Sequence, residues 1–296
     1  MLLKELDKAL ERSRVTNGKK FRLKDHDPAD TAGYRLTHEE EAALLAAGIA
    51  RLSDLQELLY AQRSWSLLCV FQAMDAAGKD GTIKHVMSGV NPQGVEVTSF
   101  KQPGPEELAH DFLWRVMRNL PDRGRIGIFN RSHYEEVLVV RVHRDLLARQ
   151  HLPERLDGKN IWKHRLEDIA SFERYLTRQG TVILKFFLNV SKEEQKRRFL
   201  ERMNHPSKNW KFSPADLAER EYWDDYIAAY EEAIAATATS HAPWSVIPAD
   251  NKGFAHLLVG AAIIEALENL DLKPPKLPPE ELARLAKGRR ALEAEK

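Results

Sequence analysis

The 296-residue sequence predicts an α/β protein in which helices cover both faces of a mostly parallel sheet. Short apolar segments typical of buried strands recur along the chain, and segments with helical periodicity separate them. Parallel strands need such crossover helices, and strands buried on both faces read as continuous apolar runs. The predicted strands are 65–72, 95–100, 125–130, 181–190 and 244–249.

Helix signals lie between these strands. The segment 38–61 carries acidic residues in its first turn, where they interact favourably with a helix N-terminus. The segment 105–120 begins with a proline, which is preferred at the first helical position. Ser213 is the expected N-cap of a helix that continues without a break through the aromatic stretch after Arg220. The other predicted helices are 160–178, 191–202 and 252–270.

The composition predicts three regions in the chain. Residues 1–37 are polar, with a basic cluster, and are interpreted as an N-terminal arm. Residues 38–272 contain all the predicted strands and form the main domain. Residues 273–296 open with a proline-rich linker and end in a charged helix, which we expect to be peripheral or used for subunit contact.

Charge, cysteine content and hydropathy exclude several classes of protein. A net charge of +1 argues against a protein that coats itself with nucleic acid, although a local basic channel remains possible. The single cysteine, Cys69, excludes a disulfide framework and is expected to be buried. No apolar run approaches the roughly 18 residues needed to span a membrane. The first residues resemble no signal or transit peptide, so cytoplasmic residence is expected.

The segment AMDAAGKDG, residues 73–81, follows the first predicted strand and precedes a helix. In this context a Gly-Lys pair indicates a phosphate-binding loop, in which backbone N–H groups turn inward and Lys79 reaches phosphate oxygens. The strict pattern fails, because Ala73 replaces the first glycine and Asp80 replaces the usual Ser or Thr. The alternative is an ordinary strand–helix turn with a surface lysine. The small residues that favour phosphate binding are Ala76, Ala77, Gly78 and Gly81.

A second polar segment, FNRSHYEE, begins where the strand 125–130 ends. Ligands in such sheets bind at the carboxyl ends of the strands. Asn130 stands where a metal-binding aspartate is usual, and Arg131 and Glu135 follow it closely. The alternative is a plain helix start capped by Ser132, which leaves the Asn-Arg pair without an explanation.

These motifs together resemble the polyphosphate kinase 2 family. The motifs DAAGKDG, NPQG, FNRSHYEEVLVVRVH and NWKFSPADLAEREYWDDY occur in the family's order between about residues 35 and 270. The resemblance implies a P-loop kinase-like three-layer sandwich, a five-stranded sheet and a helical lid at about 196–213. It also implies a Mg²⁺-dependent polyphosphate:nucleotide phosphotransferase that acts reversibly between inorganic polyphosphate and AMP, ADP or ATP. Asn130 resembles the branch that uses both AMP and ADP, and the family suggests a homodimer or homotetramer.

The resemblance also assigns roles to the polar residues. An aspartate matching Asp75 belongs to the family's metal and phosphate machinery, and Mg²⁺ prefers carboxylate, phosphate and water oxygens. Glu135 is a candidate second metal ligand, and Thr82 is a minor one. Asp80 is expected to point away from the phosphates and to cap the following helix.

Cations are expected to surround the phosphates. Lys79 should bind the phosphoryl group in transfer, Arg131 should offset its charge, and Lys84 should extend the track. In the lid, Arg198 and Arg202 share a helix face and are expected to line a polyphosphate groove with Lys208. The alternative for these lid residues is a solvated helix face.

The remaining aromatic and histidine residues are interpreted mainly as structural. His133 and His143 are expected to be hydrogen-bonded or surface residues rather than phosphate carriers. Tyr226, Tyr230 and Trp223 have core spacing, whereas Trp210 falls outside it and is a candidate for a position near the nucleotide. Two other functions remain open: an ATP-dependent nucleotide kinase, and a non-catalytic sensor of nucleotide or polyphosphate.

Overall fold

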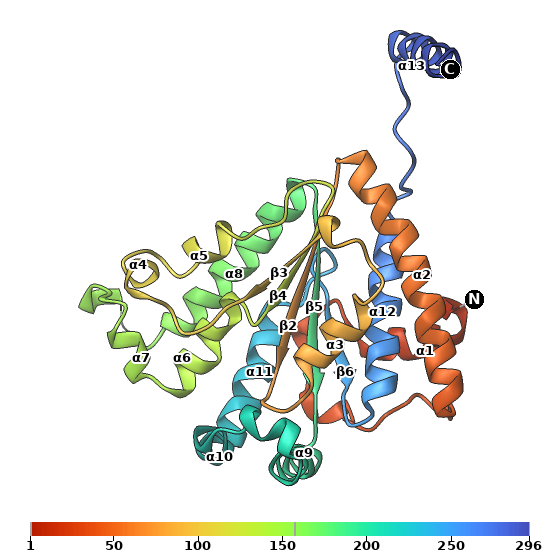
Figure 1. The fold of residues 1–296 in the computed structure, drawn as a ribbon. Helices are drawn as coiled ribbons and strands as arrows, with labels where there is room; N and C mark the ends of the chain where they lie inside the picture. The colour runs from red at the N-terminus through yellow and green to blue at the C-terminus, as the bar shows by residue number, and fades with distance from the viewer. Residues whose placement is uncertain (1, 157, 296) are drawn as a thin grey trace.

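The computed structural model describes residues 2–156 and 158–295, and its core is a sheet covered by helices on both faces (Figure 1). The strand order is β1-β6-β5-β2-β4-β3, with β1 antiparallel to β6 and all other neighbours parallel. The strands are β1 (Arg14–Val15), β2 (Ser66–Ala73), β3 (Val95–Ser99), β4 (Ile126–Asn130), β5 (Thr181–Asn189) and β6 (Trp244–Pro248). The predicted mostly parallel α/β sheet is therefore confirmed.

The helices form the two outer layers. On one face α12 packs against α1, α2 and α3, and on the other face α8 packs against α11 (Figure 1). This confirms the three-layer sandwich. The helices are α1 (Leu2–Ser13), α2 (His38–Gln62), α3 (Lys79–Val86), α4 (Pro105–Leu108), α5 (Trp114–Met117), α6 (Val139–Val142), α7 (Asp145–Ala148), α8 (Ile161–Arg178), α9 (Lys192–Asn204), α10 (Pro214–Glu219), α11 (Trp223–Thr237), α12 (Lys252–Glu268) and α13 (Pro279–Glu293).

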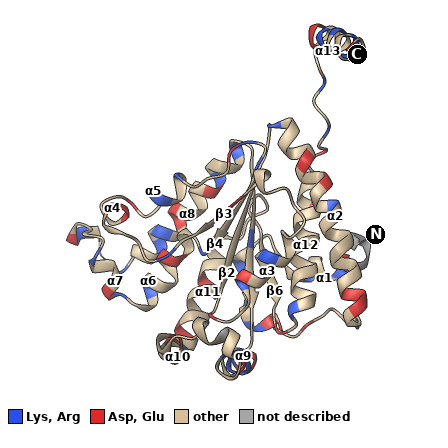
Figure 2. Cartoon of the chain, viewed as in Figure 1, with Lys and Arg blue, Asp and Glu red and all other residues tan. Residues whose placement is uncertain are grey.

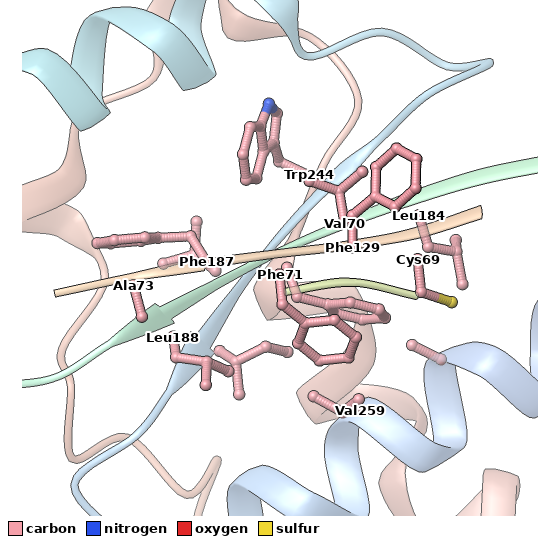
Figure 3. Packing of buried hydrophobic residues seen from close by; sticks show 14 of the residues in the cluster. Cys69, Val70, Phe71, Ala73, Phe129, Leu184, Phe187, Leu188, Trp244 and Val259 are labelled. Atoms are coloured by element: carbon pink, nitrogen blue, oxygen red, sulfur yellow. The ribbon is translucent and has the colours of Figure 1, made fainter. Parts of the chain in front are cut away.

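The central strand β2 is buried along its whole length, as its apolar sequence SLLCVFQA requires. Cys69 pairs with Ile128 on β4 and with Leu184 on β5, and its thiol lies in the core as predicted (Figure 3). Burial raises the pKa of this thiol. The core fixes the carboxyl ends of the neighbouring strands β5, β2 and β4 side by side at one end of the sheet.

The sheet has six strands rather than the predicted five, because the N-terminal region contributes one. The expectation that residues 1–37 form an arm is wrong for α1 and β1. Leu6 and Leu10 are buried in the main core, and α1 packs against α12. Apolar residues three and four apart, within a strongly charged segment, form the buried stripe of an amphipathic helix.

Two predicted helices are interrupted. The segment 105–120 forms α4 and α5, and between them Asp111 accepts a hydrogen bond from the backbone N–H of Leu113 at 2.9 Å. Such a local side-chain bond competes with helix continuation. The helix after Ser213 is likewise divided into α10 and α11 by a 3₁₀ turn at Arg220–Tyr222.

The C-terminal helix α13 stands apart from the domain at the end of an extended linker (Figure 1). It carries acidic and basic residues (Figure 2). None of its described side chains is buried. Within residues 2–156 and 158–295, no helix is both long and apolar enough to cross a bilayer.

The burial of α1 leads to a stability prediction. Leu6→Ala should lower the free energy of unfolding by about 2–5 kcal/mol, because it leaves a cavity between α1 and the core. Leu285→Ala on α13, where the side chain is 59% exposed, is the control and should change it by less than about 0.5 kcal/mol. Urea denaturation measures both. Equal, small effects would mean that α1 does not belong to the folded core.

Candidate active site

The loop between β2 and α3 has the backbone of an anion-binding turn. Ala76 and Gly78 have positive φ angles of 60° and 109°, so the chain reverses tightly before α3 begins at Lys79. The Lys79 ammonium points back into the loop and donates to the carbonyl oxygen of Ala73 at 3.2 Å. Burial, with the nearby Arg131 charge, lowers the pKa of Lys79. The predicted placement of this lysine inside the loop is therefore observed.

Arg131 lies between two carboxylates at the carboxyl ends of β2 and β4. Its Nη2 atom is 3.3 Å from Asp75 Oδ1, and its Nη1 atom is 3.5 Å from Glu135 Oε2. The opposing charge of Glu135 raises the pKa of Arg131. Burial raises the pKa of Glu135, although Arg131 and Lys79 oppose this shift. The structure thus brings together Asp75, Lys79, Arg131 and Glu135, all four predicted from the sequence.

The turn that follows β4 is fixed by local bonds. Arg131 has a φ angle of 65°, a left-handed conformation that is costly for a residue with a side chain. Its N–H donates to the carbonyl oxygen of Phe71 at 3.1 Å. Ser132 caps the 3₁₀ turn η4 (His133–Val137) by accepting from the N–H of Tyr134, so the cap that the alternative interpretation expected is present beside the charged cluster.

Gln72, which the sequence did not reveal as a site residue, supports Glu135 from β2. It is fully buried, and in the amide orientation that satisfies both its ends it donates to Glu135 Oε1 at 2.8 Å. Its oxygen then accepts from the N–H of Ser132 at 3.1 Å. The signal was a glutamine at the end of an otherwise apolar strand. An amide there must have a buried partner.

The prediction that Asp80 points away as a helix cap is wrong. Asp80 Oδ1 accepts a hydrogen bond of 2.7 Å from the side-chain amide of Asn130, across the gap between α3 and β4. The N-cap position of α3 is Gly78, without a side-chain cap bond. Asp80 and Asn130 therefore form a pair in which the neutral amide is the donor.

The other residues of α3 take different positions. The Thr82 hydroxyl is buried and donates to the carbonyl oxygen of Gly78 at 3.2 Å, which ties it to the helix backbone. Gly81 has open space around its Cα, and the Lys84 side chain is exposed one turn further along α3. Thr82 thus contacts the backbone of the loop rather than its mouth.

Arg198 is not the free groove residue that its helical spacing predicted. It is buried beneath the loop, with 3% of its side chain exposed, and Nε donates to Glu194 Oε1 at 2.7 Å. Arg197 and Arg198 lower the pKa of Glu194 to about 2. The guanidinium also donates to the carbonyl oxygens of Ala76 (3.2 Å), Ala77 (2.6 Å), Ala249 (2.5 Å) and Asp250 (3.3 Å). Arg198 therefore joins α9 to the floor of the loop.

The outer part of the lid contains the cations that remain near the surface. Arg202 is half-buried and lies 3.9 Å from Asp216 on α10. Burial and the charge of Asp75 raise the pKa of Asp216 on α10. The side chain of Lys208 lies outside the described part of the structure. Trp210 is 78% exposed.

Gln195 is a further residue that the sequence did not single out. It is buried, and its amide donates to the carbonyl oxygen of Asp75 at 2.9 Å. Arg220 donates to the other end of the same amide at 2.5 Å. The base of α9 is therefore bonded to the loop at both Gln195 and Arg198.

The aromatic and histidine predictions can also be compared with the structure. Trp223, Tyr226 and Tyr230 on α11 are buried, as predicted. His143 lies 2.9 Å from Glu219, and His133 is buried behind the site. His143 therefore has the hydrogen-bonded environment that the sequence predicted. His133 does not, because it is buried with neither ring nitrogen hydrogen-bonded to a described residue, and its Nε2 atom lies 3.7 Å from Glu173 Oε1.

The donor set between β2 and β4 suits a hard cation. Asp75 and Glu135 supply carboxylate oxygens, and the positively charged Arg131 already lies between them. Mg²⁺ at phosphate sites usually takes one or two carboxylates, with phosphate and water oxygens as its other ligands. The residues present meet this requirement.

The role of Arg198 as a buried donor predicts a large stability effect. Arg198→Gln should lower the free energy of unfolding by about 3–5 kcal/mol, because buried groups lose a charged partner. Arg197→Gln, at a neighbouring position with 61% of the side chain exposed, is the control and should leave the denaturation midpoint nearly unchanged. An unchanged midpoint for both variants would contradict the buried contacts of Arg198.

A family model described as polyphosphate kinase 2 matches residues 35–275 of this chain. An ADP-polyphosphate phosphotransferase of Rhodopseudomonas palustris is 51% identical over 267 residues, covering 90% of this chain and 92% of that protein. An AMP/ADP-polyphosphate phosphotransferase of Meiothermus ruber is 46% identical over 267 residues, covering 90% and 96%.

A solved structure gives the same comparison in three dimensions. The polyphosphate kinase 2 from Arthrobacter aurescens TC1 superposes with a TM-score of 0.84 at 43% sequence identity. The match covers 94% of this chain and 96% of that one. The similarity therefore extends over nearly the whole of both chains.

Proposed function

Because the chain belongs to the polyphosphate kinase 2 family, we propose that it transfers a phosphoryl group between inorganic polyphosphate and AMP or ADP. The observation that carries this proposal is the meeting of Lys79, Arg131, Asp75 and Glu135 at the carboxyl ends of β2 and β4. Two cations and two carboxylates at a strand–loop–helix junction suit phosphates and a divalent metal.

Phosphoryl transfer depends on positioning and charge neutralisation more than on covalent chemistry. Lys79 binds the phosphoryl group in transfer, and Arg131 offsets the charge on its oxygens. The nucleophile is a phosphate oxygen of the acceptor, so no Ser, Cys or His nucleophile is needed. The backbone N–H groups of Ala76 and of residues 78–81 hold the phosphates, whereas that of Ala77 donates to the carbonyl oxygen of Met74 at 3.2 Å.

Asp75 and Glu135 would hold Mg²⁺, with Gln72 orienting the second carboxylate. When bound, the metal would supply neutralisation of the phosphate charge. Arg131 would then share the two carboxylates with that cation. Its guanidinium is planar and has five N–H donors, so it can turn toward phosphate without losing both contacts.

The rest of the polyphosphate, beyond the phosphoryl group that it donates, lies along the outer lid. We place Arg202, Lys208 and the exposed Lys84 along its path, as cations that meet a polyanion. Residues after Arg198, up to about 213, form the part of the lid that closes over it. Arg198 itself stays bonded to the loop.

The decisive experiment incubates the pure protein with ADP or AMP, Mg²⁺ and polyphosphate, and measures ATP. ATP formation that requires polyphosphate supports the proposal. Phosphorylation of AMP by ATP without polyphosphate would instead indicate an ordinary nucleotide kinase. Binding of both ligands without turnover would indicate a sensor.

Lys79 allows a direct test of the loop. Lys79→Ala should lower kcat by about 10²–10⁴-fold, equivalent to roughly 3–5 kcal/mol of barrier, with the fold intact. Lys163→Ala, at a lysine on α8 with 73% of its side chain exposed, is the matched control and should retain full turnover. A folded Lys79→Ala protein with normal kcat would refute the assigned role.

The Asp80–Asn130 pair predicts an effect on acceptor choice. Asn130→Asp should change the ratio of AMP to ADP use by about tenfold, or about 1.4 kcal/mol, and should lower turnover. A carboxylate at position 130 would face Asp80 at hydrogen-bond distance without a proton to share. Adding Asp80→Asn restores a donor and an acceptor, so the double variant should regain turnover. Steady-state kinetics with each acceptor checks both effects, and an unchanged ratio would remove Asn130 from acceptor selection.

A further inference from the structure

A buried polar cluster lies directly behind the turn η4, on the side away from the phosphates. Its centre is Tyr134, which is fully buried and adjoins Glu135 in the chain. The Tyr134 hydroxyl donates to Glu173 Oε1 on α8 at 2.7 Å and lies 2.9 Å from Thr237 Oγ1 on α11. The ring contacts Trp244 on β6 edge-on, with centroids 4.8 Å apart.

Lys185 completes this cluster from the middle of β5. Its side chain is fully buried, and its ammonium donates to Glu173 Oε2 at 2.5 Å and to the carbonyl oxygen of Thr237 at 2.8 Å. Its third donor reaches the Tyr134 hydroxyl at 3.2 Å. Each of the three N–H groups that a lysine carries therefore has an acceptor.

Stability alone gives no reason for this arrangement. The desolvation of two buried charges is costly, and apolar residues of similar volume often stabilise a core as well or better. A buried ion pair can instead specify one geometry among several, as polar core residues do in some proteins. Here the geometry in question is that of Tyr134 and therefore of η4.

The turn needs such an external constraint. Arg131 holds a left-handed backbone conformation, with a φ angle of 65°, that persists only where its surroundings enforce it. Tyr134 lies three residues after Arg131 and one before Glu135, and its side chain points into the core. Fixing Tyr134 therefore fixes where the Glu135 carboxylate and the Arg131 guanidinium stand.

We propose that Lys185 and Glu173 are positioning residues that hold the Tyr134 hydroxyl and thereby orient Arg131 and Glu135 for phosphoryl transfer. The inference rests on the proposed function, because its tests measure the rate of the same phosphoryl transfer. It assigns a role to a charged pair that touches neither phosphate nor nucleotide. A displacement of reacting groups by about 1 Å can cost on the order of 10²-fold in rate.

The first test is Tyr134→Phe, which keeps the ring and removes the hydroxyl. We expect kcat to fall by about tenfold or more, since the turn loses its anchor. The KM for polyphosphate should change less than about twofold, because the loop and Arg198 are untouched. A folded variant with wild-type kcat would overturn the proposal. A loss of catalytic efficiency that comes only from a raised KM would also overturn it.

The second test uses the ion pair and holds even if Tyr134→Phe does not fold. Lys185→Met leaves the Glu173 carboxylate buried without its ammonium and should lower kcat by about tenfold or more. Adding Glu173→Gln removes the orphaned charge but keeps an acceptor for the Tyr134 hydroxyl. The double variant should recover kcat to within about threefold of wild type. Equal losses in the single and double variants, or no loss in the single variant, would contradict the positioning role.

Ser66→Ala is the matched control for loss of a buried hydroxyl. Ser66 lies on β2 at the opposite end of the sheet from the site, 3.0 Å from the Thr181 hydroxyl. It should lower the melting temperature without changing kcat at temperatures well below it. If Ser66→Ala lowers kcat as much as Tyr134→Phe, the effect is general destabilisation and the inference fails. The absence of any transfer by the wild-type protein would instead refute the proposed function, so the two failures are distinguishable.

Discussion

The guanidinium of Arg131 holds two carboxylates, Asp75 and Glu135, at 3.3 and 3.5 Å, and the rest of the site is arranged around this contact. Like charges so close together, partly removed from water, would otherwise repel each other or take up protons. Burial already raises the pKa of Glu135, and Arg131 opposes that shift. The fixed cation between the two carboxylates offsets their repulsion.

Holding Arg131 in place requires the chain to adopt an unfavourable backbone, and buried bonds offset this cost. Successive even-numbered residues of the turn point inward to separate partners. Ser132 contacts Gln72, Tyr134 contacts Glu173, and the Glu136 carboxylate accepts from Arg165 at 2.8 Å. Because these partners belong to β2 and α8, the turn after β4 is tied to the sheet and to one helical layer. A short turn is thereby held rigidly by residues of the folded core.

The sequence predicted the elements whose signals are local and missed the pairs that depend on distant chain segments. The strand ends agree to within about a residue, because continuous apolar runs mark buried strands. Arg198 was misplaced because helical spacing says which residues share a face, not whether that face is buried. Asp80 was misplaced because it lies on α3 and its partner, Asn130, lies far along the chain at the end of β4. Lys185 interrupts the apolar run TVILKFFLNV. A lysine within a buried strand is the one sequence feature that indicated the buried polar cluster.

The contacts of α9 join the beginning of the predicted lid to the loop between β2 and α3. The first turns of the helix carry Gln195 and Arg198, whose side chains bond to the backbone of the phosphate loop. Breaking these bonds would leave buried carbonyl oxygens without donors, at a cost of about 1–3 kcal/mol each. The beginning of the predicted lid is therefore part of the site's floor. Beyond it, Met203 and Trp210 are exposed. Arg202 lies nearer the surface than Arg198, so the charge of Arg198 acts on the loop from beneath while Arg202 remains partly exposed to solvent.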